Sequence, residues 1–354
     1  NDTSFGQLVR NLHHWSANLL VLIVFLHVMR VFFTGAFHAP RRFNWIIGWL
    51  MFGIILLANF TGYLLPYDQL AYWAVTVATG MLAYIPLVGT GLQAFVRGGA
   101  EIGPATLRIF FAVHTALLPA TLAGLAAFHF WRIRKAGGVV IPRKPGETHT
   151  TPVRVPTIPY LLLREVVTAS VLIATLLFVA VFINAPLEGP ANPGLSPNPS
   201  KAPWYFAGFQ ELLLHIHPTF AVFVVPLMVL TALFAVPYLR YEEDAAGIWF
   251  VSTRGRRLLI YSSGISCVIT VLSIILHELS MGGSPVASSR PSLVAPGGVP
   301  VVAWVAALSG ASLLLRTKFS VSKNEAVQSV FVFQVVAFIV LTLTGALFRG
   351  KNMA

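Results

Sequence analysis

The stretch LHHWSANLLVLIVFLH, residues 12–27, decides the fold, because it is apolar enough to cross a membrane and yet carries histidines near both ends. A run of about 20 apolar residues spans the hydrocarbon core of a bilayer. The chain of 354 residues is 56% hydrophobic and only 10% charged, whereas a soluble domain is usually about 25% charged. We therefore expect an all-α fold, a polytopic transmembrane bundle of about eight spans. The expected spans are 15–34, 45–65, 108–131, 161–184, 219–239, 256–276, 298–316 and 325–347.

The net charge of +12 is explained by membrane topology rather than by nucleic-acid binding. If the spans alternate in direction, most of the 24 lysines and arginines fall in the loops and span ends at one face. The positive-inside rule assigns that face to the cytoplasm. The two termini and the long loops 66–107 and 185–218 are then outside. We expect a multi-pass protein of the bacterial inner (cytoplasmic) membrane that does not bind nucleic acid.

The chain divides into two halves around a basic, proline-rich segment. Residues 1–135 hold three spans and most of the informative histidines. Residues 136–160 are predicted to be a cytoplasmic linker, because they are polar and lack helical periodicity. Residues 161–354 hold five further spans. Residues 79–98 mix apolar residues with Gly and Pro, which predicts short helices along the outer membrane surface.

Four histidines form two pairs at matched depths on the first and third spans. His13 and His27 are 14 residues apart, so on an α-helix their rings differ by about 40° and lie about 21 Å apart. His114 and His129 are 15 residues apart, which gives about 60° and about 22 Å. Both spans run inward. His13 and His114 therefore form an outer pair near the outer face, and His27 and His129 form an inner pair near the cytoplasm.

Two imidazoles that face each other across a helix bundle can hold a haem iron from both sides. Both axial positions are then filled, so such a haem carries electrons and does not bind oxygen. Ionisable side chains inside a membrane are costly and usually functional. Four of them at matched depth favour two haems over isolated, packed histidines, and the first half is then a di-haem bundle of the four-helix type. His14 points about 100° away from His13 and receives no ligand role.

Four other residues fit a haem site, although each has an ordinary explanation as well. Haem propionates are anionic, and Arg10 and Arg30 lie one turn outside His13 and His27. Both arginines are equally well explained as flanking charges of a span. Gly48 and Gly62 are 14 residues apart on the second span. Glycine lets a flat macrocycle approach the backbone, but it is also common where membrane helices touch.

These residues resemble a known family, cytochrome b of the quinol-oxidising cytochrome bc complexes. The resemblance covers residues 1 to about 280. It is closest to the chloroplast-type form, whose second histidine pair is also 15 residues apart and whose two halves, separate chains there, look fused here. It is carried by the motifs RNLHHWSAN (10–18), LHVMRVFFTG (26–35), GYLLPYDQLAYWAV (62–75), IPLVGTGL (85–92), TLRIFFAVHTALLP (106–119) and FHFWRIRKAG (128–137).

The resemblance implies two b-type haems, one of low potential on the outer pair and one of high potential on the inner pair. It also implies that Arg10 and Arg30 face propionates. Quinol would be oxidised at the outer face, with one electron passing to a Rieske iron–sulfur protein and the other through the haems to an inner quinone site. Arg134 and His149 are candidates near that inner site. A c-type cytochrome or equivalent acceptor and a homodimer of complexes are further implied partners.

The outer quinol pocket of the family lies between the 66–100 region and a PEWY motif. This chain has KAPWYFAGFQELL at 201–213. Trp204 and Tyr205 match the motif, but Pro203 stands where the family has a glutamate that is thought to take a quinol proton. Glu211 would substitute if 203–211 is helical, and an ordinary helix-end charge is the equal alternative. Further candidates at this pocket are Trp73, Ala74, His215 and His217.

Two other departures from the family concern its spans. The family has a span before the first one here, and we expect it upstream of this sequence. The attaching cysteine of a third, covalent haem would lie in that span, so the presence of such a haem stays open. Cys267, the single cysteine, lies in an apolar span and forms no haem-attachment motif. With the span 325–347, the number of spans is larger than in the mitochondrial members of the family.

Two other function classes compete with the bc-type interpretation. The first is a di-haem membrane anchor of a dehydrogenase or hydrogenase, with one quinone site and no bifurcation of electrons. The second is a transporter whose histidines relay protons, and which would show no reduced-haem absorbance. The PWY loop and the fused second half favour the bc-type interpretation over both.

Overall fold

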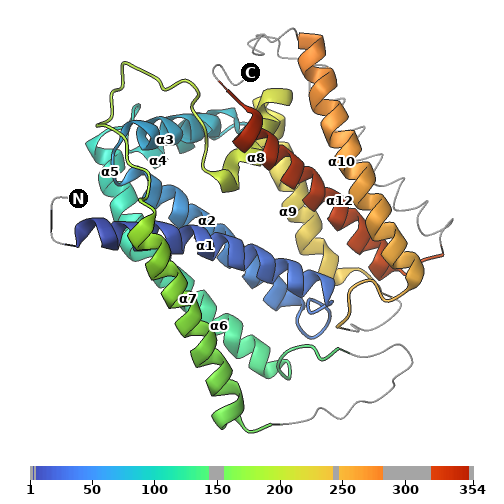
Figure 1. Ribbon diagram of the computed structural model, residues 1–354. Helices are drawn as coiled ribbons and strands as arrows, with labels where there is room; N and C mark the ends of the chain where they lie inside the picture. Colours follow the sequence, from blue (N-terminus) through green and yellow to red (C-terminus); the bar gives the residue numbers. More distant parts are fainter. Residues whose placement is uncertain (1–2, 4, 143–154, 242–246, 282–319, 351–354) are drawn as a thin grey trace.

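The computed structural model describes residues 3, 5–142, 155–241, 247–281 and 320–350 of the chain. Within these ranges the regular structure is helical, with one isolated bridge between Asp68 and Pro190. The expected all-α fold is confirmed (Figure 1). The α-helices are α1 (Gly6–Phe33), α2 (Arg42–Leu64), α3 (Gln69–Met81), α4 (Gly89–Arg97), α5 (Pro104–Ala112), α6 (Leu118–Lys135), α7 (Leu162–Phe182), α8 (Trp204–His215), α9 (Val225–Ala235), α10 (Thr253–Met281) and α12 (Lys323–Leu343).

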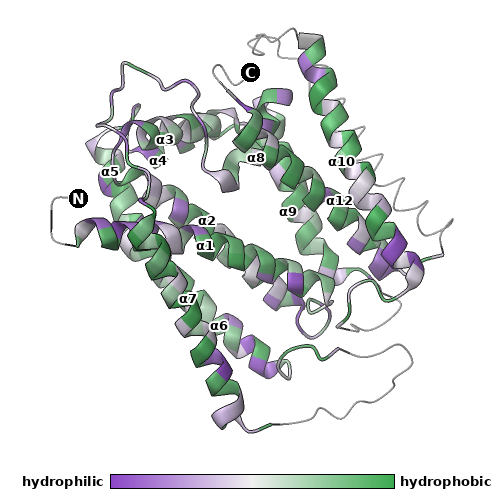
Figure 2. Cartoon of the chain, in the orientation of Figure 1, coloured by the Kyte–Doolittle hydropathy of each residue, from purple (hydrophilic) through white to green (hydrophobic). Residues whose placement is uncertain are grey.

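Seven helical segments in the described part of the chain are long and apolar enough to cross a membrane. Figure 2 shows apolar residues along most of their length and hydrophilic residues gathered towards their ends. They agree with seven of the eight expected spans, and the expected span 298–316 lies outside the described residues. The segments are Gly6–Phe33, Arg42–Leu64, Pro104–Lys135, Thr157–Phe182, Phe220–Tyr238, Thr253–Leu279 and Lys323–Phe348.

The two spans that carry the histidine pairs pack against α2, which contacts α1, α5 and α6. α7 packs against α1 as a fourth helix. Polar side chains of α1 bind the C-terminal end of α7. The amide of Asn11 donates to the carbonyl of Ala180 at 2.9 Å, and the indole of Trp15 donates to the carbonyl of Ile183 at 2.8 Å.

The remaining helices form a second group in which α12 packs against α10 and α8. The two groups meet in an aromatic core near the C-terminal end of α1. Phe32 of α1 stacks on Phe331 of α12 with ring centroids 3.8 Å apart. The buried indole of Trp45 in α2 donates to the carbonyl of Leu233 in α9 at 2.7 Å. These contacts fix α12 and α9 relative to α1 and α2.

Two π-helical turns interrupt the spans, and each lies just before a proline. The turn Val113–Leu117 precedes Pro119, and the turn Phe220–Val224 precedes Pro226. Proline has no N–H to donate, and its ring crowds the carbonyl four residues back, so the α-helical ladder cannot continue unchanged. A π turn is one way to absorb this break. The first of these turns contains His114.

The outer loop after α2 folds into the short helices α3 and α4. Asp68 caps α3 by accepting a hydrogen bond from the N–H of Ala71 at 2.8 Å. The buried guanidinium of Arg97 then joins the two helices, because it donates to the hydroxyl of Thr79 at 2.8 Å and to the carbonyl of Thr76 at 3.0 Å. The short helices agree with the expectation for residues 79–98.

Candidate functional site

The outer pair of histidines faces across the bundle. The ring centroids of His13 in α1 and His114 lie 6.0 Å apart, with the ring planes at 88°. A metal–imidazole bond is about 2 Å long, so this separation leaves room for one metal ion between the two rings. The structure thus brings together the residues that the sequence predicts as the outer ligands.

The ring of His114 is held by hydrogen bonds from α2. Its Nδ1 lies 3.0 Å from the carbonyl of Ala58 and 3.3 Å from the hydroxyl of Thr61. A carbonyl only accepts hydrogen bonds, so Nδ1 carries the proton and the lone pair is on Nε2. Metal-ligating histidines usually donate their second ring N–H in this way. The arrangement leaves Nε2 as the free ligand atom.

The π turn at Val113–Leu117 changes the rotation expected between His114 and His129. A π turn takes up about one residue more than an α turn. Fifteen residues along this segment therefore advance about as far as 14 residues of α-helix. The rotation between the rings of His114 and His129 then falls from about 60° to about 40°, the value expected for His13 and His27. The prediction from spacing was inexact because it assumed an α-helix throughout.

Gly62 of α2 lies directly against the outer pair. A Cβ atom added there would lie 2.5 Å from Cε1 and 3.0 Å from Nδ1 of His114. These distances are too short for any side chain larger than hydrogen, so the glycine is required for the position of the ring. Gly48 lies near the inner pair, but a Cβ atom there would be 3.7 Å from Cε1 of His129, an ordinary van der Waals distance, so the ring does not require a glycine at this position.

Replacing Gly62 with alanine is expected to displace the His114 ring and to remove at least half of the haem bound at the outer pair. The ring cannot yield freely, because Ala58 holds its Nδ1. Haem content per chain, measured from the reduced pyridine complex, checks this result. Gly124→Ala on α6 is the matched control, because a Cβ atom there meets nothing within 4 Å. Equal haem loss in both variants would contradict the role of Gly62.

The inner pair lines a small cavity near the C-terminal ends of α1 and α6 and the N-terminal end of α2. Its volume is about 100 Å³. His27 and His129 lie in its wall together with Arg30 and Gly48. The arrangement brings a cation and a glycine to the predicted inner ligands, as the sequence led us to expect.

For two of the three arginines that we predicted near cofactors, Arg10 and Arg134, the cofactor role stays a prediction. Arg10 donates to the carbonyls of Ala185 at 2.9 Å and Pro186 at 3.1 Å. Arg134 is exposed and is not part of the wall of the inner cavity. Arg41 lines that cavity instead, and it donates to the carbonyls that end α6. Burial lowers the pKa of Arg41. From the sequence we assigned Arg41 no role beyond that of a basic residue at one membrane face.

A larger cavity of about 490 Å³ lies between α2, α3, α4 and the start of α8. This volume falls in the usual range of about 300–1,000 Å³ for small-molecule sites. Its wall is mainly apolar, with a few polar groups that include Tyr63, Lys201 and Gln210. Ala74 and Pro203 line it as well. The cavity therefore lies where the sequence predicts the outer pocket.

The other predicted pocket residues lie beside this cavity rather than in its wall. Trp204 is 43% exposed, and its indole donates to the side chain of Asn18 at 2.8 Å. Tyr205 is buried against Val21 and Ile55, and burial raises its pKa. The indole of Trp73 donates to the carbonyl of Asn192 at 3.3 Å. The face of α8 that lines the cavity is instead formed by Phe206, Phe209 and Gln210.

Glu211 lies in the helix α8, as its proposed role requires, but its carboxylate is bound by other side chains. The carboxylate is fully buried and pairs with the guanidinium of Arg349, whose Nε is 2.9 Å from Oε2. Nε2 of His215 lies 2.8 Å from Oε1. Burial would raise the pKa of the Glu211 carboxyl, but the bonds to Arg349 and His215 outweigh it and hold the pKa below its usual range.

Two members of this cluster were not predicted from the sequence. The sequence pattern singled out neither Arg349 nor His277 as a site residue. Nδ1 of His277 in α10 lies 3.0 Å from Nδ1 of His215. The sequence feature that could have indicated this cluster is the adjacent pair His277 and Glu278 at the end of an apolar span. Of the remaining candidates, His217 accepts from the N–H of Thr219 at 3.3 Å, and His149 lies outside the described residues.

The amino-acid sequence of the chain matches a known family. The family described as cytochrome b (N-terminal)/b6/petB matches residues 18–191. The menaquinol:cytochrome c reductase cytochrome b subunit of Geobacillus thermodenitrificans is 46% identical over 138 residues, and that of Bacillus subtilis (strain 168) is 48% identical over 138 residues. Each match covers 39% of this chain and 62% of the relative. Cytochrome b6 of Picosynechococcus sp. is 45% identical over 137 residues, again 39% of this chain and 62% of the relative.

The chain thus spans about three fifths of the length of the curated relatives that it matches. A likeness of fold extends over nearly the whole chain. A structure titled hyperthermophilic respiratory Complex III matches with a TM-score of 0.63 at 24% identity. The match covers 97% of this chain and 79% of the other. At this identity the likeness shows the fold alone.

Proposed function

We propose that this membrane protein is the cytochrome b subunit of a bc-type complex, because residues 18–191 match the cytochrome b (N-terminal)/b6/petB family. The complex oxidises quinol at the outer face, passes one electron to a Rieske iron–sulfur partner and the other across the membrane, and contributes to proton translocation. The outer histidine pair is the observation that carries this proposal, because two imidazoles 6.0 Å apart on different spans suit the two sides of one haem iron.

The described residues fit two b-type haems. His13 and His114 would hold the outer one, and His27 and His129 the inner one. Gly62 keeps the space beside His114 open, which is the kind of close approach a flat macrocycle needs. When bound, a haem with two histidine ligands supplies electron transfer without binding oxygen. The protein's part is to fix the rings and their tautomers.

The charged residues at the inner cavity would bind the anionic parts of a cofactor or of a quinone. Arg30 and Arg41 both line that cavity. A guanidinium is suited to bind carboxylates, because it offers paired donors. We propose Arg30 for the propionates of the inner haem and Arg41 for the inner quinone site. The proposal for Arg10 at the outer haem is weaker, because its guanidinium binds main-chain carbonyls of the 185–186 turn.

We propose the 490 Å³ cavity as the quinol site. Its apolar wall suits a ring and an isoprenoid tail, and Tyr63, Lys201 and Gln210 can orient the quinol hydroxyls. Pro203 supplies shape but no proton acceptor. Glu211 as the acceptor stays a prediction, and the ion pair with Arg349 argues against it, since a paired carboxylate with a lowered pKa is a weak base.

The assembly around the chain follows from the same proposal. We propose a Rieske protein and a c-type cytochrome or equivalent acceptor as partners, a homodimer of complexes, and the bacterial inner membrane as the location. The fused second half, with α8 forming part of the cavity wall, favours this over a di-haem anchor of a dehydrogenase or hydrogenase.

A redox titration of the purified protein with optical detection tests the proposed function. Two b-type steps of different midpoint potential are expected, with haem reduction on addition of quinol. A di-haem anchor would also show two steps, and it differs in lacking bifurcation, so its quinol oxidation would not require the high-potential acceptor of a Rieske partner. The absence of any reduced-haem band would favour the third function class, a transporter whose histidines relay protons.

Filling the quinol cavity is expected to block quinol oxidation and to leave the haems in place. In Ala78→Phe, a benzyl group enters the cavity from α3, so we expect the turnover with quinol to fall at least tenfold at unchanged haem content. Val171→Phe on the exposed face of α7, where Val171 is 60% exposed, is the matched control. Full turnover in Ala78→Phe would contradict the assignment of this cavity.

A further inference from the structure

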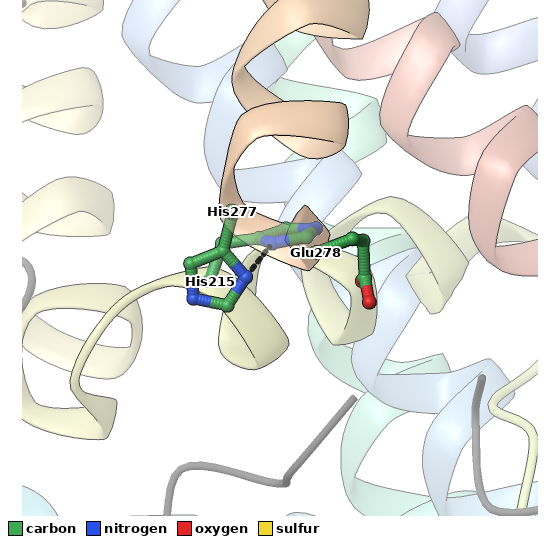
Figure 3. Close-up of side chains that lie close together, drawn as sticks. All are labelled: His215, His277 and Glu278. Atoms are coloured by element: carbon green, nitrogen blue, oxygen red, sulfur yellow. Dashed lines mark hydrogen bonds between the residues drawn. The ribbon is translucent and has the colours of Figure 1, made fainter. Parts of the chain in front are cut away.

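A group of two imidazoles and a carboxylate lies at the outer end of the second helix group. His215 ends α8, and His277 and Glu278 belong to the last turns of α10 (Figure 3). One possible ligand atom from each residue lies within 4.8 Å of the other two. The proposed haems and the quinol cavity use none of these three residues.

Bonds to Glu211 prepare His215 for metal binding. Nε2 of His215 lies 2.8 Å from the fully buried carboxylate of Glu211. A carboxylate only accepts hydrogen bonds, so Nε2 carries the proton and the lone pair of Nδ1 faces His277. A histidine that donates its second N–H to a carboxylate is the usual arrangement at a metal site.

We propose that His215, His277 and Glu278 bind a divalent transition metal, for which Zn²⁺ is the best fit. Two imidazoles and one carboxylate are a common zinc ligand set, and they leave a fourth position for water. Zinc–ligand bonds of about 2 Å require the three ligand atoms to lie within about 4 Å of one another. Side-chain movements of about 1 Å bring them there. When Nδ1 of His277 binds the metal, the proton that it shares with His215 moves to Nε2 of His277, so both imidazoles stay neutral.

The charges around the group suit a cation that exchanges with solvent. Glu211 and Glu278 carry two negative charges, and Arg349 contacts both carboxylates, at 2.8 Å in the case of Glu278. With neutral imidazoles, one negative charge is left over for the metal. Arg349 competes for Glu278, and the side chain of Glu278 is 39% exposed. The bound metal would tie the end of α8 to α10.

Zinc binding to the purified, haem-containing protein tests the inference. The protein is treated with EDTA, desalted and titrated with zinc chloride, and bound zinc is measured by mass spectrometry. We expect one zinc per chain that His277→Ala lacks and that Glu278→Gln binds at least tenfold more weakly. His217→Ala is the matched control, because His217 lies two residues from His215 and outside the group. The zinc X-ray absorption edge should report two imidazole nitrogens.

Equal zinc binding in the wild type, His277→Ala and Glu278→Gln would overturn the inference, and so would equal loss in His217→Ala. Glu278→Gln is nearly isosteric at a partly exposed position, so it decides the outcome if His277→Ala does not fold. The haem spectrum depends on other histidines. It therefore reports on the proposed function independently of the zinc result.

Discussion

We expect the variant His13→Ala to contain one haem per chain and the wild type to contain two. His13 has one partner across the bundle, His114, at a ring separation of 6.0 Å, and removal of either ring leaves the iron with a single protein ligand. The inner pair lies about 21 Å away along α1, so its haem should be retained. Haem per chain and the loss of one step from the redox titration measure the effect. Quinol oxidation should fall to background.

His14→Ala provides a control at the adjacent position. The His14 ring packs edge-to-face on Trp15, with centroids 5.1 Å apart, and it points away from the outer pair. This variant should keep both haems and both redox steps. Haem loss in His14→Ala, or two unshifted steps in His13→Ala, would contradict the ligand assignment.

The second large effect is expected at Glu211. Glu211→Ala leaves the buried guanidinium of Arg349 with only the partly exposed Glu278 as an anionic partner, and it removes the acceptor of His215. Breaking a buried ion pair by removal of one partner costs about 3–5 kcal/mol. We expect a destabilisation of about 3 kcal/mol, measured by thermal or denaturant unfolding in detergent.

A double variant tests whether the broken ion pair between Glu211 and Arg349 causes the loss of stability. Replacement of both Glu211 and Arg349 with methionine should recover most of the lost stability, because two apolar side chains leave no buried charge unpaired. A double variant as unstable as Glu211→Ala would show that the ion pair is not the cause. If Glu211→Gln keeps full stability but loses quinol oxidation more than tenfold, Glu211 is the proton acceptor instead.

The pH dependence of stability follows from the lowered pKa of Glu211. A carboxyl group whose pKa is lower in the folded state contributes stability above its unfolded pKa, which is usually 4.5. This contribution is lost as the pH falls through the folded-state value. The wild type should therefore lose stability relative to Glu211→Gln below about pH 4.5, and a constant difference between the two proteins would contradict the ionised state of Glu211.

The spans and the histidine pairs could be predicted because they depend on local regularities. Apolar runs and the rotation of an α-helix are properties of neighbouring residues, and they sufficed to bring His13 and His114 to one level. The partners of Glu211 depend on tertiary packing. Arg349 is 138 residues further along the chain, and neither its sequence position nor its charge indicates contact with α8.

The cavity wall on α8 was mispredicted in part for a related reason. The motif drew attention to Trp204 and Tyr205, whereas the rotation of the helix brings Pro203, Phe206 and Gln210 to the cavity. The motif gives residue types but not the face that each one takes. That face depends on where α8 packs, which is decided by the contacts of Tyr205 with α1 and α2.

The π turn beside His114 makes the third span tolerant to a change in chain length. Deletion of one residue, such as Ala116, would let the segment Pro104–Lys135 relax into a shorter helix with the surplus residue gone. His129 would then keep its direction relative to His114, because the π turn would become an α turn and the positions of the two imidazoles would not change. Homologous proteins with either separation between these two ligands can therefore share one cofactor arrangement, and drift between the two lengths requires no compensating change on the facing helix.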